Sequence, residues 1–103
     1  DEAQDLCKLQ WRMIAKITQN ARKVYISGDD DQAIYNWAGA DVKYFIELPG
    51  EVETLKQSFR CSSVIQNLSN DIINRVKFRR DKQWKGTSRE GKVQYHTFPF
   101  IVN

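Results

Sequence analysis

The feature that most constrains the fold of this chain is an alternation between segments with helical periodicity and short β-rich runs. Apolar residues recur at intervals of three and four in three segments, as in helices that bury one face. Runs containing β-branched and aromatic residues separate them. The expected helices are 6–21, 40–47 and 63–78, and the expected strands are 24–27, 51–58 and 93–98. This alternation predicts an α/β fold with a mainly parallel sheet flanked by helices.

The composition is that of a globular domain. Of the 103 residues, 41% are apolar and 28% are charged, a balance that is not typical of disordered chains. No apolar run approaches the roughly 20 residues that a membrane-spanning helix needs, and no signal-peptide pattern opens the chain. Cys7, Cys61 and His96 are too few for a structural zinc site. We therefore expect a cytoplasmic protein without a membrane partner.

The net charge of +3 conceals an uneven distribution along the chain. Residues 1–74 carry 8 basic and 11 acidic side chains, whereas residues 75–103 carry 8 basic and 2 acidic ones. A basic segment beside an acidic body suits contact with the phosphate backbone of a nucleic acid. A solvated connector between domains is the alternative role of the same segment.

Adjacent carboxylates occur in the run Asp1-Glu2-Ala3-Gln4-Asp5. Carboxylate oxygens suit a hard cation such as Mg²⁺, and a neighbouring carboxylate can take a proton from an attacking water. The run is equally typical of an acidic helix start, where negative side chains lie near the positive end of the helix dipole. These residues alone leave both interpretations open.

A polar acidic loop, Gly28-Asp29-Asp30-Asp31-Gln32, follows the expected strand over 24–27. In open α/β sheets, ligands bind beyond the carboxyl ends of the strands. The amide of Gln32 is suited to contact a phosphate or to orient a water. Tyr35 and Trp37 follow at a spacing of two, so in an extended segment both rings would project to one side and could stack on unpaired bases. Filling a core is the alternative role of the two rings.

A third candidate is Phe59-Arg60, where a strand is expected to give way to a helix near Ser63. An arginine at such a point could bind a phosphate through two hydrogen bonds. A surface salt bridge is the alternative role of Arg60.

In order and spacing, these blocks resemble three motifs of UvrD/Rep/PcrA-like superfamily 1A DNA helicases. Asp1-Glu2-Ala3-Gln4-Asp5 resembles the Walker B box, or motif II. Residues 28–41, which begin with Gly28-Asp29-Asp30-Asp31-Gln32 and contain Tyr35 and Trp37, resemble motif III. Residues 55–62, Leu-Lys-Gln-Ser-Phe-Arg-Cys-Ser, resemble motif IV. The middle block is the most specific of the three, and the resemblance covers nearly the whole chain.

The resemblance implies that the chain is a fragment of an ATP-dependent DNA helicase with RecA-like motor domains of the P-loop NTPase fold. Residues 1–80 would form the C-terminal half of the first RecA-like domain, 81–91 a basic linker, and 92–103 the start of the second domain. The implied activity is 3′→5′ translocation on single-stranded DNA coupled to ATP hydrolysis. Single-stranded DNA, duplex junctions and ATP are the implied partners.

The same resemblance implies roles toward the nucleotide. Asp1, with Glu2 nearby, would hold Mg²⁺, and Glu2 would activate the hydrolytic water. Gln32 and Arg60 would contact the γ-phosphate, where Arg60 would stabilise the developing charge. Phe59 would stack on adenine, and its ring keeps the stacking face of the more usual tyrosine but lacks the hydroxyl.

Toward DNA, Tyr35 and Trp37 match aromatic residues that stack on single-stranded bases in these helicases. Gln32 lies three residues before Tyr35, so one short segment could link the state of the γ-phosphate to the DNA strand. Members of the family commonly carry an arginine beside the tryptophan, whereas Asn36 and Ala38 flank Trp37 in this chain. One cation near the DNA is therefore missing from the pattern.

The phosphate-binding loop of such helicases, Gly-x-x-x-x-Gly-Lys-Ser/Thr, does not occur in the 103 residues. Its main-chain amides and its lysine hold the phosphates in line for attack. We therefore expect the helicase and ATPase activity of the complete protein, and no activity from the 103-residue chain alone.

Three other functions fit parts of the sequence. A stand-alone single-stranded nucleic-acid-binding module would use Tyr35, Trp37 and the basic residues 75–92. A polymerase metal site at Gly28-Asp29-Asp30 would need apolar strands on both sides of the turn, but Asp31-Gln32 follow it directly. An inactive helicase remnant would share all the features of a working motor.

Overall fold

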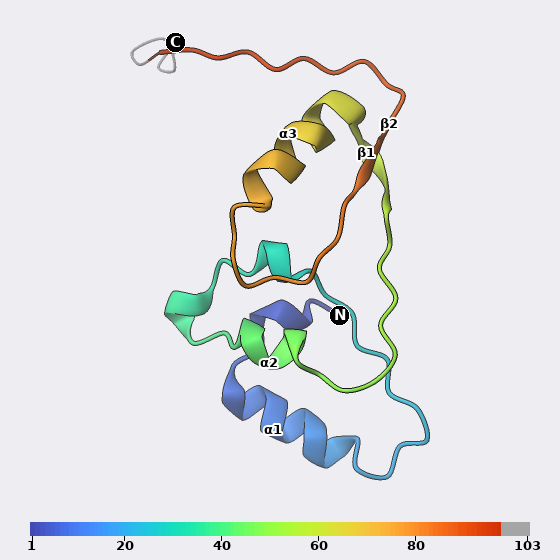
Figure 1. Cartoon of the computed structure of the whole chain (residues 1–103). Coiled ribbons are helices and arrows are strands. Elements are labelled where there is room, and N and C mark those ends of the chain that lie inside the picture. Colours follow the sequence, from blue (N-terminus) through green and yellow to red (C-terminus); the bar gives the residue numbers. More distant parts are fainter. Residues whose placement is uncertain (98–103) are drawn as a thin grey trace. The chain divides into compact units, whose positions relative to one another are not determined.

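The computed structural model describes residues 1–97, which form two compact units (Figure 1). Unit 1 comprises Asp1–Val52 together with Phe78–Arg80, and unit 2 comprises Glu53–Lys77 and the described residues from Asp81 onward. Helices occur in both units and unit 2 contains a parallel pair of strands, so the predicted α/β class is confirmed. None of the helices in the described part of the chain combines the length and the apolar character that crossing a membrane requires.

Unit 1 is built from short helices joined by extended segments. They are η1 (Ala3–Asp5), α1 (Lys8–Ile17), η2 (Asp30–Gln32), η3 (Asn36–Ala38) and α2 (Val42–Ile46). The helices expected over 6–21 and 40–47 are thus present but shorter. α1 begins after Cys7, whose N–H donates to Gln10 Oε1 at 2.9 Å, and the Asp41 carboxylate accepts a main-chain N–H in the first turn of α2. These side chains satisfy donors that a helix start leaves without partners.

The centre of unit 1 lies where α1 meets α2. Trp11 of α1 is 2% exposed, and its ring packs on Tyr44 of α2 with the ring centroids 5.0 Å apart. Cys7, at the start of α1, pairs with Ala40 in an isolated antiparallel bridge. These contacts hold α1 against the segment that follows the acidic loop 28–32.

The prediction of a buried strand over 24–27 is wrong. The segment has no strand assignment in the structure, and Val24 and Tyr25 are 47% and 86% exposed. Ser27 accepts a hydrogen bond from Ala3 N at 3.1 Å, but no ladder forms with other described residues. A β-rich composition gives a strand only where a neighbouring strand supplies hydrogen-bonding partners.

Unit 2 is a small α/β layer (Figure 1). β1 (Gln57–Ser62) leads directly into α3 (Ser63–Ile73), and β2 (Lys85–Thr87) pairs in parallel with β1, so that the three elements form a βαβ unit. α3 contacts both strands. The Ser62 hydroxyl caps α3 by accepting from Ile65 N at 3.5 Å, and Ser63 Oγ donates to Thr87 O at 2.9 Å.

Two boundaries around α3 differ from the prediction. The sequence predicts a strand over 51–58, but the strand in the structure is β1, over Gln57–Ser62. β2 supplies hydrogen-bonding partners at that position. The helix expected to continue to residue 78 ends at Ile73. The N–H groups of Arg75 and Val76 bond three residues back rather than four, which tightens and closes the last turn.

The residues after α3 also depart from the expected pattern. Residues 81–91, expected to link two domains, contain β2 and so contribute to the sheet of unit 2. The strand expected over 93–98 is absent over 93–97, where no neighbouring strand pairs with the chain among the described residues. Phe98 lies outside the described residues. The assignment of 1–80, 81–91 and 92–103 to two motor domains and a linker stays a prediction.

Gly86→Ala is expected to destabilise unit 2 by about 1–3 kcal/mol. A Cβ at Gly86 would lie 2.6 Å from main-chain atoms of Ser62 and Ser63, so β2 would have to move away from the start of α3. Urea unfolding followed by circular dichroism measures the change in unfolding free energy. Ser88→Ala, at an exposed position just beyond β2, is the matched control and should stay within about 0.5 kcal/mol of the original chain. Equal unfolding free energies for the two variants would contradict the close packing at Gly86.

Candidate functional site

Asp1 and Glu2 lie beside the end of the extended segment 24–27. The Ser27 hydroxyl donates to Asp1 Oδ1 at 2.8 Å, and the Glu2 N–H donates to the same oxygen at 2.9 Å. Glu2 has a φ of 55°, in the left-handed region that residues with a side chain rarely occupy. Both residues are exposed, and Asp1 Oδ2 accepts no hydrogen bond from another described residue. An exposed carboxylate held in place through one oxygen is chemically suited to bind a hard cation with the other.

Gln4 joins these carboxylates to the acidic loop 28–32. Its side chain is buried, at 2% exposure. Gln4 Nε2 donates to Glu2 Oε2 at 2.6 Å, and Gln4 Oε1 accepts from Asp29 N at 3.0 Å. A Cβ at Gly28 would lie 2.7 Å from Gln4 Oε1, so the absence of a side chain at Gly28 permits this close approach. The nitrogen and the oxygen of the buried Gln4 amide therefore connect Glu2 with the acidic loop.

The acidic loop presents Gln32 on a short 3₁₀ helix, η2. Asp29 caps η2 by accepting from Asp31 N at 3.1 Å through Oδ1, and Asp29 Oδ2 accepts from Gln32 Nε2 at 2.7 Å. The hydrogen bonds run from Glu2 through Gln4 and Asp29 to Gln32. The structure thus connects two of the predicted catalytic residues, Glu2 and Gln32, through Gln4 and Asp29, to which sequence reasoning assigned no connecting role.

Trp37 lies on η3 and Tyr35 directly precedes it, so the condition of an extended segment, under which both rings would project to one side, is not met. Their ring centroids are nevertheless only 6.4 Å apart, with an interplanar angle of 55°. Tyr35 is 45% exposed and Trp37 is 84% exposed, which excludes the alternative that both rings fill the core of unit 1. Gly39, with a φ of 92°, closes the helix in a conformation that favours glycine. The two rings form an exposed aromatic pair.

Phe59 and Arg60 lie on β1 in unit 2, whereas the other predicted site residues belong to unit 1. The position just before α3 matches the prediction that a strand gives way to a helix there. Phe59 is 80% exposed, and Arg60 is exposed and forms no ion pair with another residue in 1–97. The structure therefore gives no support to the alternative role of Arg60 in a surface salt bridge.

Sequence reasoning missed the role of Arg79 and Arg80, which it placed in a basic segment suited either to contact with a nucleic acid or to a connector between domains. Arg79 Nε and Nη2 each donate to one carboxylate oxygen of Asp31, both at 2.7 Å. Arg80 N donates to Asp30 Oδ2 at 2.7 Å, and Arg80 Nη2 donates to Ile46 O at 2.8 Å. Two arginines of the basic segment thus form hydrogen bonds within unit 1. No local signal could have identified the pairing, because Arg79 lies 48 residues after Asp31.

Asp29, Asp30 and Asp31 are close enough for one oxygen of each to lie within 4.8 Å of the others, a spacing that a metal ion could bridge. Their carboxylates accept hydrogen bonds from Gln32, from the main chain at Arg80 and from Arg79. A set of acidic side chains with these partners has a structural role in shaping η2. Asp1 and Glu2 are the better candidates for a cation.

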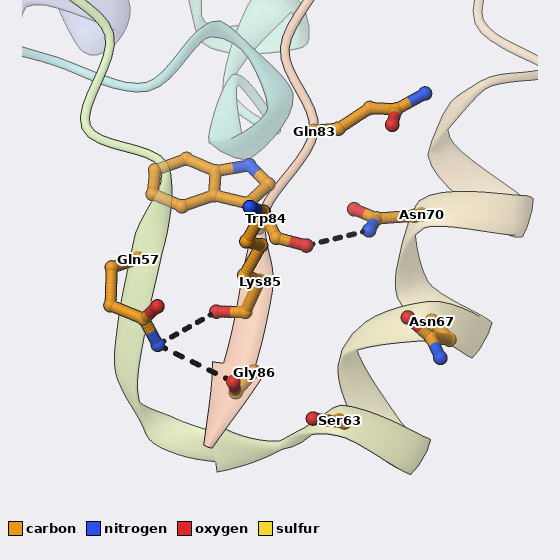
Figure 2. Close-up of a pocket in the computed structure, with 8 residues that line it drawn as sticks. All are labelled: Gln57, Ser63, Asn67, Asn70, Gln83, Trp84, Lys85 and Gly86. Carbon is orange, nitrogen blue, oxygen red and sulfur yellow. Dashed lines mark hydrogen bonds between the residues drawn. The ribbon is translucent and has the colours of Figure 1, made fainter. Parts of the chain in front are cut away.

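Unit 2 contains an open cavity of about 480 Å³. Its lining mixes polar and apolar surface and consists of Gln57, Ser63, Asn67, Asn70, Gln83, Trp84, Lys85 and Gly86. Figure 2 shows Gln57 donating to main-chain oxygens of Lys85 and Gly86, and Asn70 donating to Trp84 O at 2.9 Å. The two amides hold β2 in place from two sides. None of the predicted site residues lines this cavity.

Comparison with known proteins identifies the family of this sequence. Residues 1–53 match the family described as UvrD/REP helicase N-terminal domain. This range contains Asp1, Glu2, Gln32, Tyr35 and Trp37, whereas Phe59 and Arg60 lie beyond it.

Individual relatives extend the similarity to most of the chain. The ATP-dependent DNA helicase PcrA of Staphylococcus epidermidis is 31% identical over 102 residues, which cover 93% of this chain and 14% of the relative. The ATP-dependent DNA helicase PcrA of Staphylococcus aureus is 29% identical with the same coverage. The chain therefore spans about one seventh of the length of these relatives.

Proposed function

The chain belongs to the UvrD/REP helicase family, and on this premise we propose that it forms part of the motor of an ATP-dependent DNA helicase. We refer to the longer protein that would contain this motor as the complete helicase. The observation that carries the proposal is the connection from Glu2 through the buried Gln4 and Asp29 to Gln32. In this proposal residues 1–5, 28–41 and 55–62 are motifs II, III and IV, and residues 1–80 belong to the first of two RecA-like domains.

Asp1, Glu2 and Gln32 would act on the triphosphate of ATP. The chemistry of the donors fits Mg²⁺, because Asp1 offers a carboxylate oxygen that no other described residue occupies. Bound there, Mg²⁺ would neutralise charge on the phosphate oxygens. Glu2, held by the amide of Gln4, is the carboxylate that takes a proton from the attacking water. Gln32, held by Asp29, contacts the γ-phosphate and orients that water.

Phe59 and Arg60 would act on the adenine and on the γ-phosphate, respectively. Phe59 is exposed on β1 and offers a flat apolar face on which adenine can stack. Arg60 carries a guanidinium without an ion-pair partner among residues 1–97, so it can meet the charge that develops on the γ-phosphate during transfer. Their position beside each other on one strand supports a joint role toward base and phosphate.

Tyr35 and Trp37 would stack on bases of single-stranded DNA. The segment between Gln32 and the aromatic pair is tied by short-range bonds, since Ile34 N donates to Gln32 O at 2.9 Å and Ala38 N donates to Tyr35 O at 2.9 Å. A movement of Gln32 on loss of the γ-phosphate would therefore shift the rings that contact DNA. This coupling is the means by which hydrolysis would drive translocation in the 3′→5′ direction.

We expect the complete helicase to hydrolyse ATP in response to single-stranded DNA and to unwind a duplex with a 3′ tail, but not one with a 5′ tail. The 3′ tail allows a 3′→5′ motor to load on the strand along which it moves toward the duplex. A gel assay of strand separation with both tails, with ATP hydrolysis measured in parallel, tests the proposal. Unwinding of the 5′-tailed duplex alone would reverse the polarity, and hydrolysis without any dependence on DNA would remove the proposed function.

The 103-residue chain is the comparison protein in the same assays. Because no Gly-x-x-x-x-Gly-Lys-Ser/Thr loop occurs in it, nothing holds the phosphates in line with the water, and we expect no ATP hydrolysis. Steady DNA-stimulated phosphate release by this chain, free of contaminating enzymes, would show that other groups replace the loop.

A further inference from the structure

In unit 1, Arg79 and Asp31 form an ion pair that is largely buried. The side chains of Arg79 and Asp31 are 8% and 10% exposed, and two N–H groups of one guanidinium meet the two oxygens of one carboxylate. Such a two-point pair fixes distance and direction together, which a lysine cannot do. The pair therefore restrains the position of Asp31 more tightly than a single hydrogen bond at the surface would.

Around this pair, the segment 78–80 holds η2 by its main chain as well. Arg80 N donates to Asp30 Oδ2, so consecutive aspartates of η2 bind consecutive residues of the segment. Arg80 Nη2 reaches Ile46 O at the end of α2 and anchors the segment itself. On another side of the loop, Gln4 accepts from Asp29 N. The loop that ends in Gln32 is therefore held by two separate parts of unit 1.

We propose that Arg79 is a positioning residue for Gln32, and this inference rests on the proposed function of Gln32 at the γ-phosphate. Asp31 N donates to the same Asp29 carboxylate that accepts from Gln32 Nε2. When Arg79 fixes Asp31, it also fixes the carboxylate that aims the Gln32 amide. Without Arg79, the Asp31 carboxylate, which is 10% exposed, would lose two hydrogen bonds to a positive charge, and this loss favours movement of the loop toward water.

A direct contact between Arg79 and DNA phosphates is the competing role, since Arg79 lies in the basic stretch 75–92. Its burial and its two bonds to Asp31 oppose this role. Phosphate contacts fall instead to the exposed cations of the stretch, which are Arg75, Lys77, Lys85, Arg89 and Lys92. Arg79 is thus separated in function from its basic neighbours.

Amide hydrogen exchange of the 103-residue chain tests the positioning directly. In Arg79→Met, exchange at Gln32 and Ala33, whose N–H groups close η2, should be faster by about tenfold or more. Arg79→Lys keeps the charge but not the two-point geometry and should give a smaller increase. Arg22→Met removes an exposed arginine elsewhere in unit 1 and should leave these amides unchanged. If Arg79→Met also loses protection in α1, the chain has unfolded and Arg79→Lys decides the question.

ATP hydrolysis by the complete helicase separates positioning from simple support of the fold. Arg79→Lys should lower kcat by about tenfold while KM for ATP changes less than about twofold, because the affected group acts on the transition state. Unchanged exchange at Gln32, or changed exchange with an unchanged kcat, would overturn the inference. A complete helicase that lacks ATPase activity before any substitution would instead refute the proposed function, and the exchange result would then show only that Arg79 orders the loop.

Discussion

Arg60→Ala in the complete helicase is expected to lower kcat for ATP hydrolysis by about 10³-fold. Arg60 is exposed on β1 without an ion-pair partner among the described residues, so its charge is available to a ligand. A guanidinium beside the γ-phosphate stabilises charge that develops only during transfer, and its loss therefore affects the rate more than binding. The Kd for nucleotide should change by less than about tenfold for the same reason.

Three further variants make this test specific. Arg60→Lys keeps one positive charge but loses the paired N–H groups, and should give an intermediate rate. Gln32→Ala removes a neutral donor and should lower kcat by about 10²-fold. Lys56→Ala removes an exposed cation just before β1 and should leave the rate unchanged. Full activity of Arg60→Ala, or an equal loss in Lys56→Ala, would refute the role of Arg60.

The helices could be predicted because their signals are local. In α1 and α3 the apolar residues repeat at helical spacing within a few turns, and no distant partner is needed to produce that pattern. The ends were harder to predict, because they depend on single hydrogen bonds. At the start of α3, the Ser62 hydroxyl accepts from Ile65 N, and the next hydroxyl, that of Ser63, donates to Thr87 O in β2.

The strands could not be placed by composition alone, because a strand is defined by its partner. The run 24–27 has the more β-rich composition, yet it stays unpaired among the described residues. Lys85–Thr87 contains a glycine and a lysine and still forms β2, because β1 lies beside it and Gly86 permits a close approach to Ser62. Pairing over long sequence separation outweighs local preference in both cases.

The candidate site shows the same division. The roles proposed for Glu2, Gln32 and Arg60 come from motifs, and they stay predictions. The groups that hold Glu2 and the acidic loop could not be predicted, because Gln4 and Arg79 look like ordinary polar residues in the sequence. Gln4 becomes significant through its burial, and Arg79 through a partner 48 residues away. Motif spacing therefore suggests which residues to test, and the fold shows which side chains hold them.

Trp37→Ala is expected to weaken binding of single-stranded DNA by the complete helicase by about 10- to 100-fold. Trp37 is 84% exposed, and its ring centroid lies 6.4 Å from that of Tyr35, so the indole offers an exposed face on which a base can stack. Loss of the indole removes one stacking contact and no charge. The slope of log K against log salt should therefore stay the same while the affinity falls at every salt concentration.

Anisotropy of a labelled oligothymidylate measures this affinity without relying on tryptophan fluorescence. Tyr25→Ala is the matched control, because Tyr25 is 86% exposed in the same unit but stands apart from the aromatic pair. Trp37→Phe keeps a stacking face and should retain most of the affinity. Equal losses in Tyr25→Ala and Trp37→Ala would mean that exposed aromatic surface in general, rather than this pair, binds DNA. A motor fragment that contributes one of several DNA contacts must bind DNA more weakly than the complete helicase. If the 103-residue chain bound the oligonucleotide as tightly as the complete helicase, the aromatic pair would therefore belong to a stand-alone binding module.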